Sequence, residues 1–247
     1  MMMKNQFFEI QENYMGFWYK ARCSLTKRLI ECYAANNELE ILDVGCADGY
    51  IRSTLWYYKN YDGNDIINDY SYLFRNFYLG DICSLKIQKK YDVIIALEIM
   101  EHLPDDKAFM QKLSSLLNEG GYIFLSVPAF QYLFGKHDKM LKHYRRYDKK
   151  SMEKLVKNTK ELSIKQISYW GRILYPIALL TKGTRRVKKN TPIIDNFFLL
   201  ALLRDNSKII REDKVNFGTS MIVVLKKNGI NKNFKEKKLP HWSDEMF

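Results

Sequence analysis

Apolar residues in the first half of the chain fall into short continuous runs and into longer stretches with a period near 3.6. The short runs predict strands at 39–44, 77–79, 91–97 and 122–127, and a further strand is expected at 60–65. The longer stretches predict helices, at 14–36, 50–58 and 105–117. Runs that are apolar throughout are typical of strands buried on both faces. The alternation therefore predicts an α/β fold, with a mostly parallel sheet and helices on both of its faces.

The pattern is less regular in the second half, where a long loop is expected over 129–148. The remaining elements predicted from the same two periods are a helix and two strands, at 149–158, 163–169 and 220–225. Two apolar segments, 172–181 and 193–203, stand on either side of the basic run 182–189. The second half thus combines a few regular elements with a basic and apolar insertion.

These elements divide the chain into five predicted parts. They are an N-terminal helical cap (1–36), a Rossmann-like core (37–170), a basic and apolar helical insertion (171–216), a final strand of the core (217–227) and a basic tail (228–247). The insertion is expected to bind substrate, to form a lid or to form an interface. Its apolar segments would pack on the sheet or on a second subunit, or would lie in a bilayer interface.

Charge is divided unevenly along the chain. Residues 1–130 contain 13 Lys and Arg against 17 Asp and Glu, whereas residues 131–247 contain 27 against 11, within a net charge of +12. A basic half predicts an anionic partner, such as a phosphorylated or acidic sugar, membrane headgroups or nucleic acid. A solvated basic surface in a lysine-rich protein is the alternative.

The spacing of the cysteines and the length of the apolar stretches exclude further classes of protein. The four cysteines show no paired spacing, so the sequence predicts neither a disulfide framework nor a metal site. No apolar stretch is long enough for a signal peptide or a membrane-spanning helix. We therefore expect a cytoplasmic protein, and leave open both peripheral contact with the inner face of the membrane and oligomer formation.

The stretch 39–49 is the most informative in the chain. An apolar strand carries Asp43 near its end, and Gly45 and Gly49 follow in a tight turn before a helix. Glycines in such a turn let the backbone approach a ligand closely, while the acid offers an acceptor for amine or hydroxyl groups. Asp65 lies 22 residues beyond Asp43, where this architecture places its ribose-binding acid.

Five features in this order resemble the class I S-adenosyl-L-methionine (SAM) methyltransferases that act on small molecules. They are the glycine turn after Asp43, the second-strand acid Asp65, the pair Asp81-Ile82, the run Glu98-Ile99-Met100-Glu101-His102-Leu103 and the pair Gly120-Gly121. The resemblance implies a Rossmann-like sheet of seven mostly parallel strands with an antiparallel last strand. It also implies SAM as the methyl donor, with S-adenosyl-L-homocysteine (SAH) as product. Ala47 stands where the family more often has a third glycine.

The resemblance further implies which residues hold the cofactor. Asp43 and the backbone of Gly45 would face the methionine amino group, and Asp65 would accept both ribose hydroxyls. Asp81 and the Ile82 N–H would bind the adenine. The full set is Asp43, Gly45, Cys46, Gly49, Asp65, Ile66, Asp81, Ile82, Leu97 and Glu98. The alternative is that the strand-end acids only cap helices or form turns, which explains each acid singly but not their joint spacing.

Three histidines are candidates for a general base. Methyl transfer is an in-line displacement at an activated sulfonium methyl, so a base is needed only for a hydroxyl or a protonated amine. His102, His137 and His143 are the candidates, because imidazole titrates near neutral pH. His102 follows the fourth strand, at the sheet edge where such folds place their sites. Capping of the helix near Pro104, or packing beneath the cofactor, would also explain His102.

A narrower resemblance is carried by His137-Asp138 and His143-Tyr144-Arg145-Arg146-Tyr147-Asp148, supported by Phe17-Trp18-Tyr19, Arg22 and 217–220. These segments look like a bacterial branch found beside glycosyltransferases in polysaccharide and capsule gene clusters, which frequently has His where this chain has Gly16. The likeness implies O-methylation of a sugar hydroxyl or phosphate-type group on a small or carrier-linked acceptor. The expected substrate contacts are Trp18, Tyr19, Arg22, Arg145, Arg146 and Tyr147, with the last two arginines able to clamp a phosphate or carboxylate.

Two other functions remain as alternatives. A nucleic-acid methyltransferase would suit the basic half, but no Asn-Pro-Pro-Tyr-like run follows the fourth strand and the sequence has no RNA-binding motif. A catalytically inactive, membrane-peripheral scaffold of a glycan assembly complex would keep the fold without turnover. The presence of both cofactor acids, Asp43 and Asp65, favours an active site over the scaffold.

Overall fold

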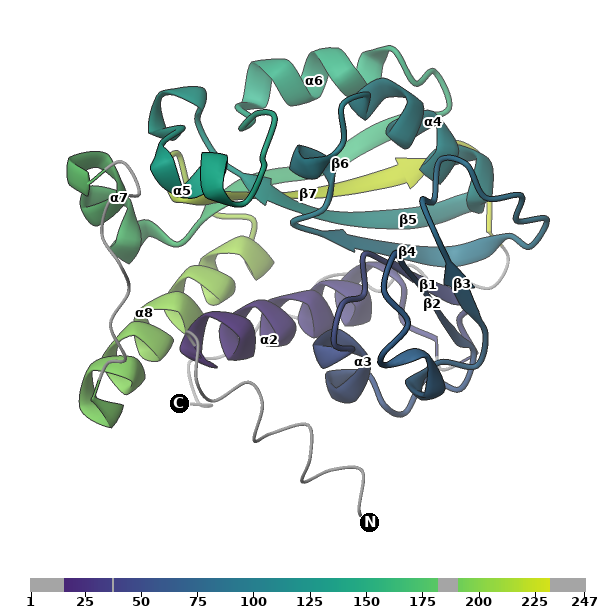
Figure 1. The fold of residues 1–247 in the computed structure, drawn as a ribbon, viewed down its shortest axis with the longest axis horizontal. Coiled ribbons are helices and arrows are strands. Elements are labelled where there is room, and N and C mark those ends of the chain that lie inside the picture. The colour runs from purple at the N-terminus through teal and green to yellow at the C-terminus, as the bar shows by residue number, and fades with distance from the viewer. Residues whose placement is uncertain (1–15, 37, 182–190, 232–247) are drawn as a thin grey trace.

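The computed structural model describes residues 16–36, 38–181 and 191–231, which form one seven-stranded sheet between two layers of helices (Figure 1). In spatial order the strands are β3 (Phe77–Leu79), β2 (Tyr61–Asp65), β1 (Ile41–Val44), β4 (Tyr91–Leu97), β5 (Leu117–Pro128), β7 (Ser220–Lys227) and β6 (Leu162–Trp170). β7 is antiparallel to both of its neighbours, and the other neighbouring strands pair in parallel. The predicted α/β fold, with its antiparallel last strand, is confirmed.

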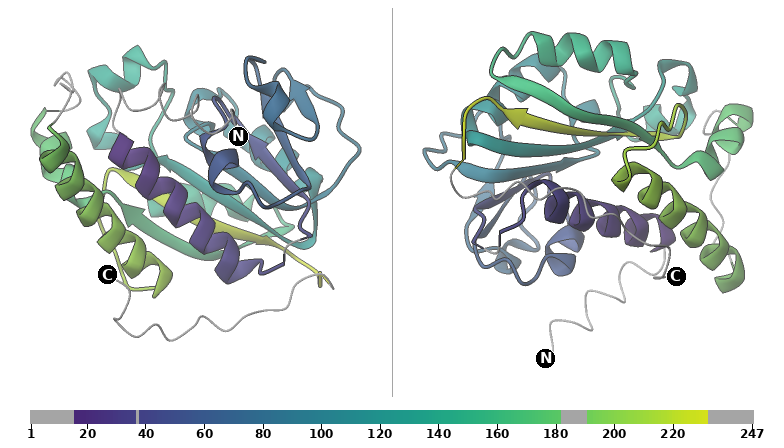
Figure 2. Two further views of the ribbon diagram at one scale, coloured as in Figure 1. Left: turned by 90° about the horizontal axis from the view of Figure 1, so that it is seen from below. Right: turned by 180° about the vertical axis from the view of Figure 1, so that it is seen from behind.

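Helices cover both faces of this sheet (Figures 1 and 2). One face carries α2 (Gly16–Tyr33), α3 (Tyr50–Thr54) and α8 (Pro192–Ile210), and the other carries α4 (Asp106–Leu116) and α6 (Lys149–Lys157). The shorter helices are α5 (Lys136–Met140), α7 (Tyr175–Thr181) and the 3₁₀ turns η1 (Ser71–Leu73), η2 (Met100–His102), η3 (Gln131–Leu133) and η4 (Arg172–Leu174). The hydrophobic core is accordingly split into two clusters by the sheet.

β4 shows how the apolar runs produce this layering. Ile94 and Ala96 belong to the cluster under α4 and α6, whereas Val93 and Ile95 belong to the cluster under α2 and α8. Alternate residues of a strand point to opposite faces of the sheet. An uninterrupted apolar run therefore suits a strand that has helices on both sides.

The helical insertion packs on the N-terminal helix. Phe17 of α2 stacks on Phe198 of α8 with 5.3 Å between ring centroids. Trp170, at the end of β6, donates its indole N–H to the Asn206 Oδ1 over 2.8 Å, and the Asn206 amide donates to the Ala21 carbonyl over 2.8 Å. These buried bonds hold α2, α8 and β6 together. Among the described residues, no helix is long and apolar enough to cross a membrane.

Two boundaries in the first half differ from the sequence prediction by four residues or more. α3 ends four residues before the end of the helix predicted at 50–58. β5 begins five residues before the strand predicted at 122–127. Leu117 already pairs with Tyr91 across a register shift, and Gly120 accommodates the strand's irregularity with a φ of 70°. The glycine pair therefore lies inside the strand rather than before it.

The loop predicted over 129–148 is more regular than expected. It contains η3 and α5, and the Asp138 carboxylate accepts the Gly135 N–H at the start of α5 over 2.8 Å. The basic run 182–189 and residues 232–247 of the predicted tail lie outside the described residues, as do residues 1–15. The division into five parts remains a prediction.

Candidate active site

The turn after β1 lies so close to its neighbours that it needs glycine. Gly45 has a φ of 70°, and a Cβ there would lie 2.9 Å from the Ile99 Cδ1. The N–H groups of Gly45 and Cys46 donate to the Asn64 carbonyl over 2.9 and 3.1 Å, which ties the turn to β2. Ala47 also has a positive φ, of 44°, a conformation that costs a non-glycine residue about 1–2 kcal/mol. The turn is thus held in a strained shape at the carboxyl end of β1.

Asp43 is a buried carboxyl beneath this turn. It is 3% exposed, and the Tyr61 hydroxyl donates to its Oδ2 over 2.9 Å. Burial raises the pKa of Asp43 to about 7, against the lowering effect of the Tyr61 hydrogen bond. Such a carboxyl holds a proton just below neutrality and ionises when a cation lies beside it. The amino group of a bound methionine moiety would be such a cation.

The acids that follow β2 and β3 support backbone turns. Asp65 accepts the Ala47 N–H at Oδ2 over 2.8 Å and the Ile67 N–H at Oδ1 over 3.2 Å. Asp81 accepts the Cys83 N–H over 2.9 Å. Asp65 and Asp81 therefore do form turns, as the alternative to a cofactor role expects. A carboxylate has about four lone-pair sites, so these bonds leave room for ligand hydroxyl or amino groups as well.

The two isoleucines of the predicted cofactor set differ in exposure. Ile66, directly after β2, is 73% exposed, whereas Ile82 is 3% exposed. Among the described residues, none accepts a hydrogen bond from the Ile82 N–H. β2 and β3 pair in parallel, so their carboxyl ends lie at the same edge of the sheet. An exposed apolar side chain and an unpaired donor at one edge suit an adenine ring, which has apolar faces and acceptor nitrogens.

Glu98 and Arg22 connect α2 to the end of β4. Glu98 has a φ of 54°, and its N–H donates to the Ser126 carbonyl over 2.8 Å. The Ser126 hydroxyl donates to the Glu98 carboxylate, and the Arg22 Nη2 lies 3.6 Å from its Oε1. The Arg22 guanidinium also lies over the rings of Trp18 and Tyr19, 5.4 and 5.9 Å from their centroids. The three predicted substrate contacts of α2 therefore lie together beside Glu98.

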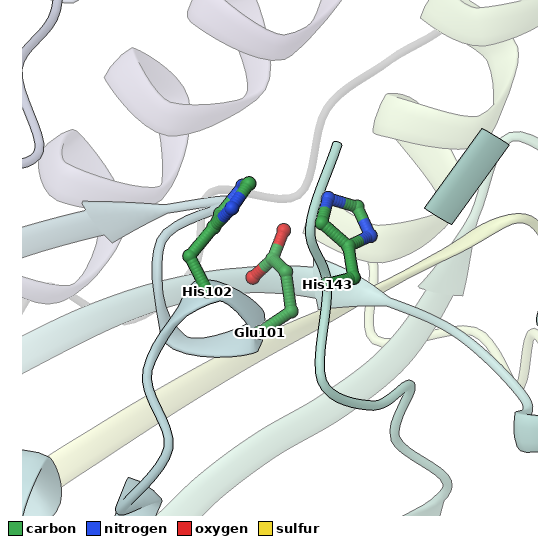
Figure 3. Close-up of side chains that lie close together, drawn as sticks. All are labelled: Glu101, His102 and His143. Atoms are coloured by element: carbon green, nitrogen blue, oxygen red, sulfur yellow. The ribbon is translucent and has the colours of Figure 1, made fainter. Parts of the chain in front are cut away.

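Glu101, His102 and His143 form a cluster just beyond β4 (Figure 3). One potential ligand atom from each lies within 4.8 Å of the others, and the two imidazole centroids are 4.5 Å apart. Burial, and then the charge of Glu98, raise the pKa of Glu101 well above its usual range. Burial, and then His143, lower the pKa of His102. His137, the third predicted base, lies in α5 outside this cluster, and burial lowers its pKa.

Asp138 sets the orientation of His143. Its Oδ1 lies 2.9 Å from the His143 Nδ1 and 2.8 Å from the Arg146 Nε. Burial raises the pKa of Asp138, but hydrogen bonds from His143, Arg146 and the Gly135 N–H outweigh burial and lower it to about 2. An ionised Asp138 favours the tautomer of His143 that is protonated on Nδ1. The Nε2 of His143 is then the acceptor nitrogen.

The basic residues after His143 hold the loop in place instead of forming an open anion clamp. Arg145 pairs with Asp106 of α4 over 2.9 Å, and Arg146 pairs with Asp138. Tyr147 is 2% exposed, and its hydroxyl donates to Asp106 over 3.2 Å. The structure thus does not provide the two-arginine clamp or the Tyr147 substrate contact that the sequence suggested, because both guanidinium groups already face carboxylates and the tyrosine lies in the core.

Comparison with known proteins identifies the domain that carries these residues. A protein-family model described as a methyltransferase domain matches residues 17–167, which include the glycine turn and all three residues of the Glu101 cluster. The chain belongs to this methyltransferase domain family. A search of curated proteins finds no match to this methyltransferase sequence.

Solved structures share the fold of this methyltransferase. An S-adenosylmethionine-dependent methyltransferase from Clostridium acetobutylicum is 16% identical with a TM-score of 0.54, over 85% of this chain and 92% of that one. The plantazolicin methyltransferase BpumL, in complex with SAH, is 14% identical with a TM-score of 0.55, over 92% and 90%. Coclaurine N-methyltransferase, bound to N-methylheliamine and SAH, is 14% identical with a TM-score of 0.54, over 84% and 72%. These similarities establish the shared fold.

The residues at the carboxyl ends of the parallel strands fit a bound SAM molecule. Asp43 suits the amino group, the glycine turn excludes a side chain where a ligand would approach, and Ile82 keeps a donor unpaired. Gly49 ends the turn with a φ of 71°. Leu97 and Glu98 lie at the carboxyl end of β4, the strand that pairs with β1. These groups can bind and orient SAM, whose sulfonium supplies the reactive methyl.

Glu101 is the site residue that the sequence prediction missed. It lies within the run that suggested the family, yet no role was assigned to it. An acid directly before His102 and after a buried strand was the available signal. The expectation of no metal site rested on cysteine spacing, and it did not consider a mixed set of carboxylate and imidazole groups such as Glu101, His102 and His143.

Proposed function

We propose that this chain is a SAM-dependent methyltransferase that methylates an oxygen atom of a small or carrier-linked polar acceptor. The observation that carries the proposal is the joint placement of Asp43, the Gly45 turn and Asp65 at adjacent strand ends. A buried carboxyl suits the amino group of SAM, and a second carboxyl at the end of β2 suits two ribose hydroxyls. Membership in the methyltransferase domain family supports the same cofactor.

The acceptor is proposed to lie beside the Glu101 cluster. Glu101 and His102 follow Glu98 by three and four residues, and His143 lies beside them, so the cluster stands at the end of β4, next to the strand that carries the glycine turn. In the displacement, the acceptor oxygen bonds to the methyl carbon while the C–S electron pair returns to sulfur, which leaves neutral SAH. A hydroxyl acceptor must also lose its proton, and His102 and His143 are the groups placed to assist that loss.

A direct test is titration of the purified full chain with SAM by calorimetry. We expect stoichiometric binding to the wild type. The Asp65→Ala variant should bind about ten-fold to a hundred-fold more weakly, because it loses hydrogen bonds to a charged group. Asp69→Ala, an exposed acid nearby, is the matched control and should bind like the wild type. The absence of detectable heat at millimolar SAM would refute the proposed cofactor.

The acceptor class we propose is a sugar hydroxyl or phosphate-type group in the assembly of surface polysaccharide, such as capsule or lipopolysaccharide. The resemblance of 137–148 to the polysaccharide-associated branch supports it, as does the excess of basic residues over 131–247. Trp18 and Tyr19 add aromatic surface beside Glu98. The test is SAH release, with a mass gain of one methylene, on nucleotide sugars and lipid-linked saccharides. Methylation of amines alone would contradict O-methylation.

A carrier-linked acceptor would bring the enzyme to the inner face of the membrane, and we propose that the protein is cytoplasmic and makes peripheral contact there. The surface of α7 and α8 supports the proposal, because Leu180, Ile193 and Phe197 are 86%, 81% and 60% exposed. The test is sedimentation with anionic lipid vesicles. Leu180→Ser and Phe197→Ser should reduce co-sedimentation, whereas Trp56→Ser, at a 69% exposed aromatic just after α3, should not. Equal sedimentation of all variants would count against this surface.

The two alternative functions can be separated with the same preparation. A nucleic-acid methyltransferase would be retained on RNA in a salt-dependent manner, and we expect no such retention, so that RNA methylation would overturn the proposal. A scaffold would bind SAM tightly without turnover on any saccharide acceptor. Co-purification with a glycosyltransferase, combined with failure to produce SAH, would favour the scaffold.

A further inference from the structure

Glu101 is a buried carboxyl without a protein partner. It is fully buried in η2, and neither of its carboxylate oxygens has a hydrogen-bond partner among the described residues. The two nearby guanidinium groups are engaged elsewhere, because Arg22 faces Glu98 and Arg146 pairs with Asp138. A buried carboxyl is normally hydrogen-bonded, ion-paired or bound to a metal ion. The lack of a hydrogen-bond partner for either Glu101 oxygen therefore points to a ligand that the chain itself does not supply.

Two imidazole groups stand on either side of this carboxylate. Figure 3 shows the Glu101 side chain rising between His102 and His143. The three potential ligand atoms lie within 4.8 Å of one another. Atoms that share one Zn²⁺ ion at the usual bond lengths lie about 3–4 Å apart, so small side-chain rotations bring this set to metal-binding distances.

One nitrogen of the His143 imidazole is already bonded to an oxygen. The His143 Nδ1 lies 2.9 Å from the Asp138 Oδ1. Metal-binding histidines nearly always donate their other N–H to a carboxylate or carbonyl in this way. The Tyr144 N–H also donates to the Glu101 carbonyl over 2.8 Å, which fixes the two segments against each other.

We infer that Glu101, His102 and His143 bind a divalent first-row metal ion of the Zn²⁺ type. Two imidazole nitrogens and one carboxylate oxygen are a ligand set that suits such ions, and three protein ligands leave a coordination position open. The inference rests on the proposed function only for the occupant of that position, which is the acceptor oxygen.

The metal ion would explain how a hydroxyl acceptor becomes a nucleophile near neutral pH. A bound divalent ion lowers the pKa of a coordinated hydroxyl, so that the O–H proton passes to water. The oxygen then forms its bond to the methyl carbon as the C–S pair returns to sulfur. In this arrangement His102 and His143 assist proton loss through the ion rather than by taking the proton themselves.

The test is Zn²⁺ binding to the full chain after treatment with EDTA and removal of the chelator. Calorimetry and metal analysis should give one equivalent for the wild type. Glu101→Gln, which keeps the side-chain shape, and His143→Ala should bind Zn²⁺ at least ten-fold more weakly. His137→Ala removes a histidine of the same loop outside the cluster, and it should retain one equivalent.

Several outcomes would overturn the inference. One is the absence of Zn²⁺ binding by the wild type. Another is equal Zn²⁺ binding by the wild type, Glu101→Gln and His143→Ala, because the ion would then bind elsewhere. If Glu101→Gln fails to fold by circular dichroism, the visible d–d spectrum of bound Co²⁺ decides: it should be lost in His102→Ala and His143→Ala and kept in His137→Ala. SAM binding without Zn²⁺ binding refutes only the metal site, whereas Zn²⁺ binding without SAM binding refutes only the proposed function.

Discussion

SAM binding is expected to release a proton from Asp43. In the ligand-free protein burial raises the pKa of this carboxyl to about 7, although the Tyr61 hydroxyl donates to it. The amino group of SAM carries a positive charge, which would lower that pKa far below 7 in the complex. Because the free protein holds a proton on Asp43 below pH 7 and the complex does not, affinity for SAM must fall as the pH falls.

The size of the effect follows from the pKa. Asp43 is ionised in about one half of the free molecules at pH 7 and in about one tenth at pH 6. The dissociation constant of SAM should therefore rise about five-fold between pH 7 and pH 6, and about ten-fold for each further unit. The SAM amino group stays protonated over this range, since α-amino groups titrate near pH 8.

Calorimetry in two buffers that differ in protonation enthalpy measures both affinity and proton release. We expect about half a proton released at pH 7 and nearly one at pH 6. Tyr61→Phe should move the midpoint to higher pH, because it removes a hydrogen bond that lowers the Asp43 pKa. Asp43→Asn should bind SAM with no such pH dependence. An equal pH slope in Asp43→Asn and the wild type would refute the reasoning.

Two substitutions test the packing that positions the site. Gly63→Ala would bring a Cβ to 2.6 Å from the Phe74 ring. It should lower the free energy of unfolding, measured by urea denaturation, by about 1–3 kcal/mol. Gly16→Ala is the control, because a Cβ there would have no atom within 4 Å, and it should cause no such loss. Trp170→Phe leaves the buried Asn206 Oδ1 without its donor and should cost about 1–3 kcal/mol in the same assay, so that an unchanged midpoint would contradict the role given to this bond.

The sheet and the cofactor edge could be predicted because both depend on local patterns. β4 is apolar at nearly every position, and only a central strand with helices on both faces buries such a run. Asp43 and Asp65 stand near the ends of two predicted strands, and parallel neighbours end at the same edge. Their proximity thus follows from the order of elements along the chain, without knowledge of any side-chain contact.

The partners of the basic loop could not be predicted, because they depend on how distant segments fold against each other. The sequence shows Arg145 and Arg146 as adjacent charges, typical of an anion clamp. It does not show that Asp106 of α4 and Asp138 of α5 meet them. Likewise, Glu101 and His143 are far apart in the chain, and the Tyr144 N–H bond to the Glu101 carbonyl brings their segments together.

The direction of the pKa shift distinguishes buried carboxyl groups whose charge the protein compensates from buried carboxyl groups whose charge it does not. Asp138 is buried, yet bonds from His143 and Arg146 lower its pKa to about 2, so its charge is already compensated. Asp43 and Glu101 are buried as well, but burial raises the pKa of both because the protein offers them too little compensation. Strongly perturbed buried groups cluster at functional sites for this reason. One uncompensated carboxyl lies at the glycine turn, where we propose that the methyl donor binds, and the other lies just beyond β4, where we propose that the acceptor binds.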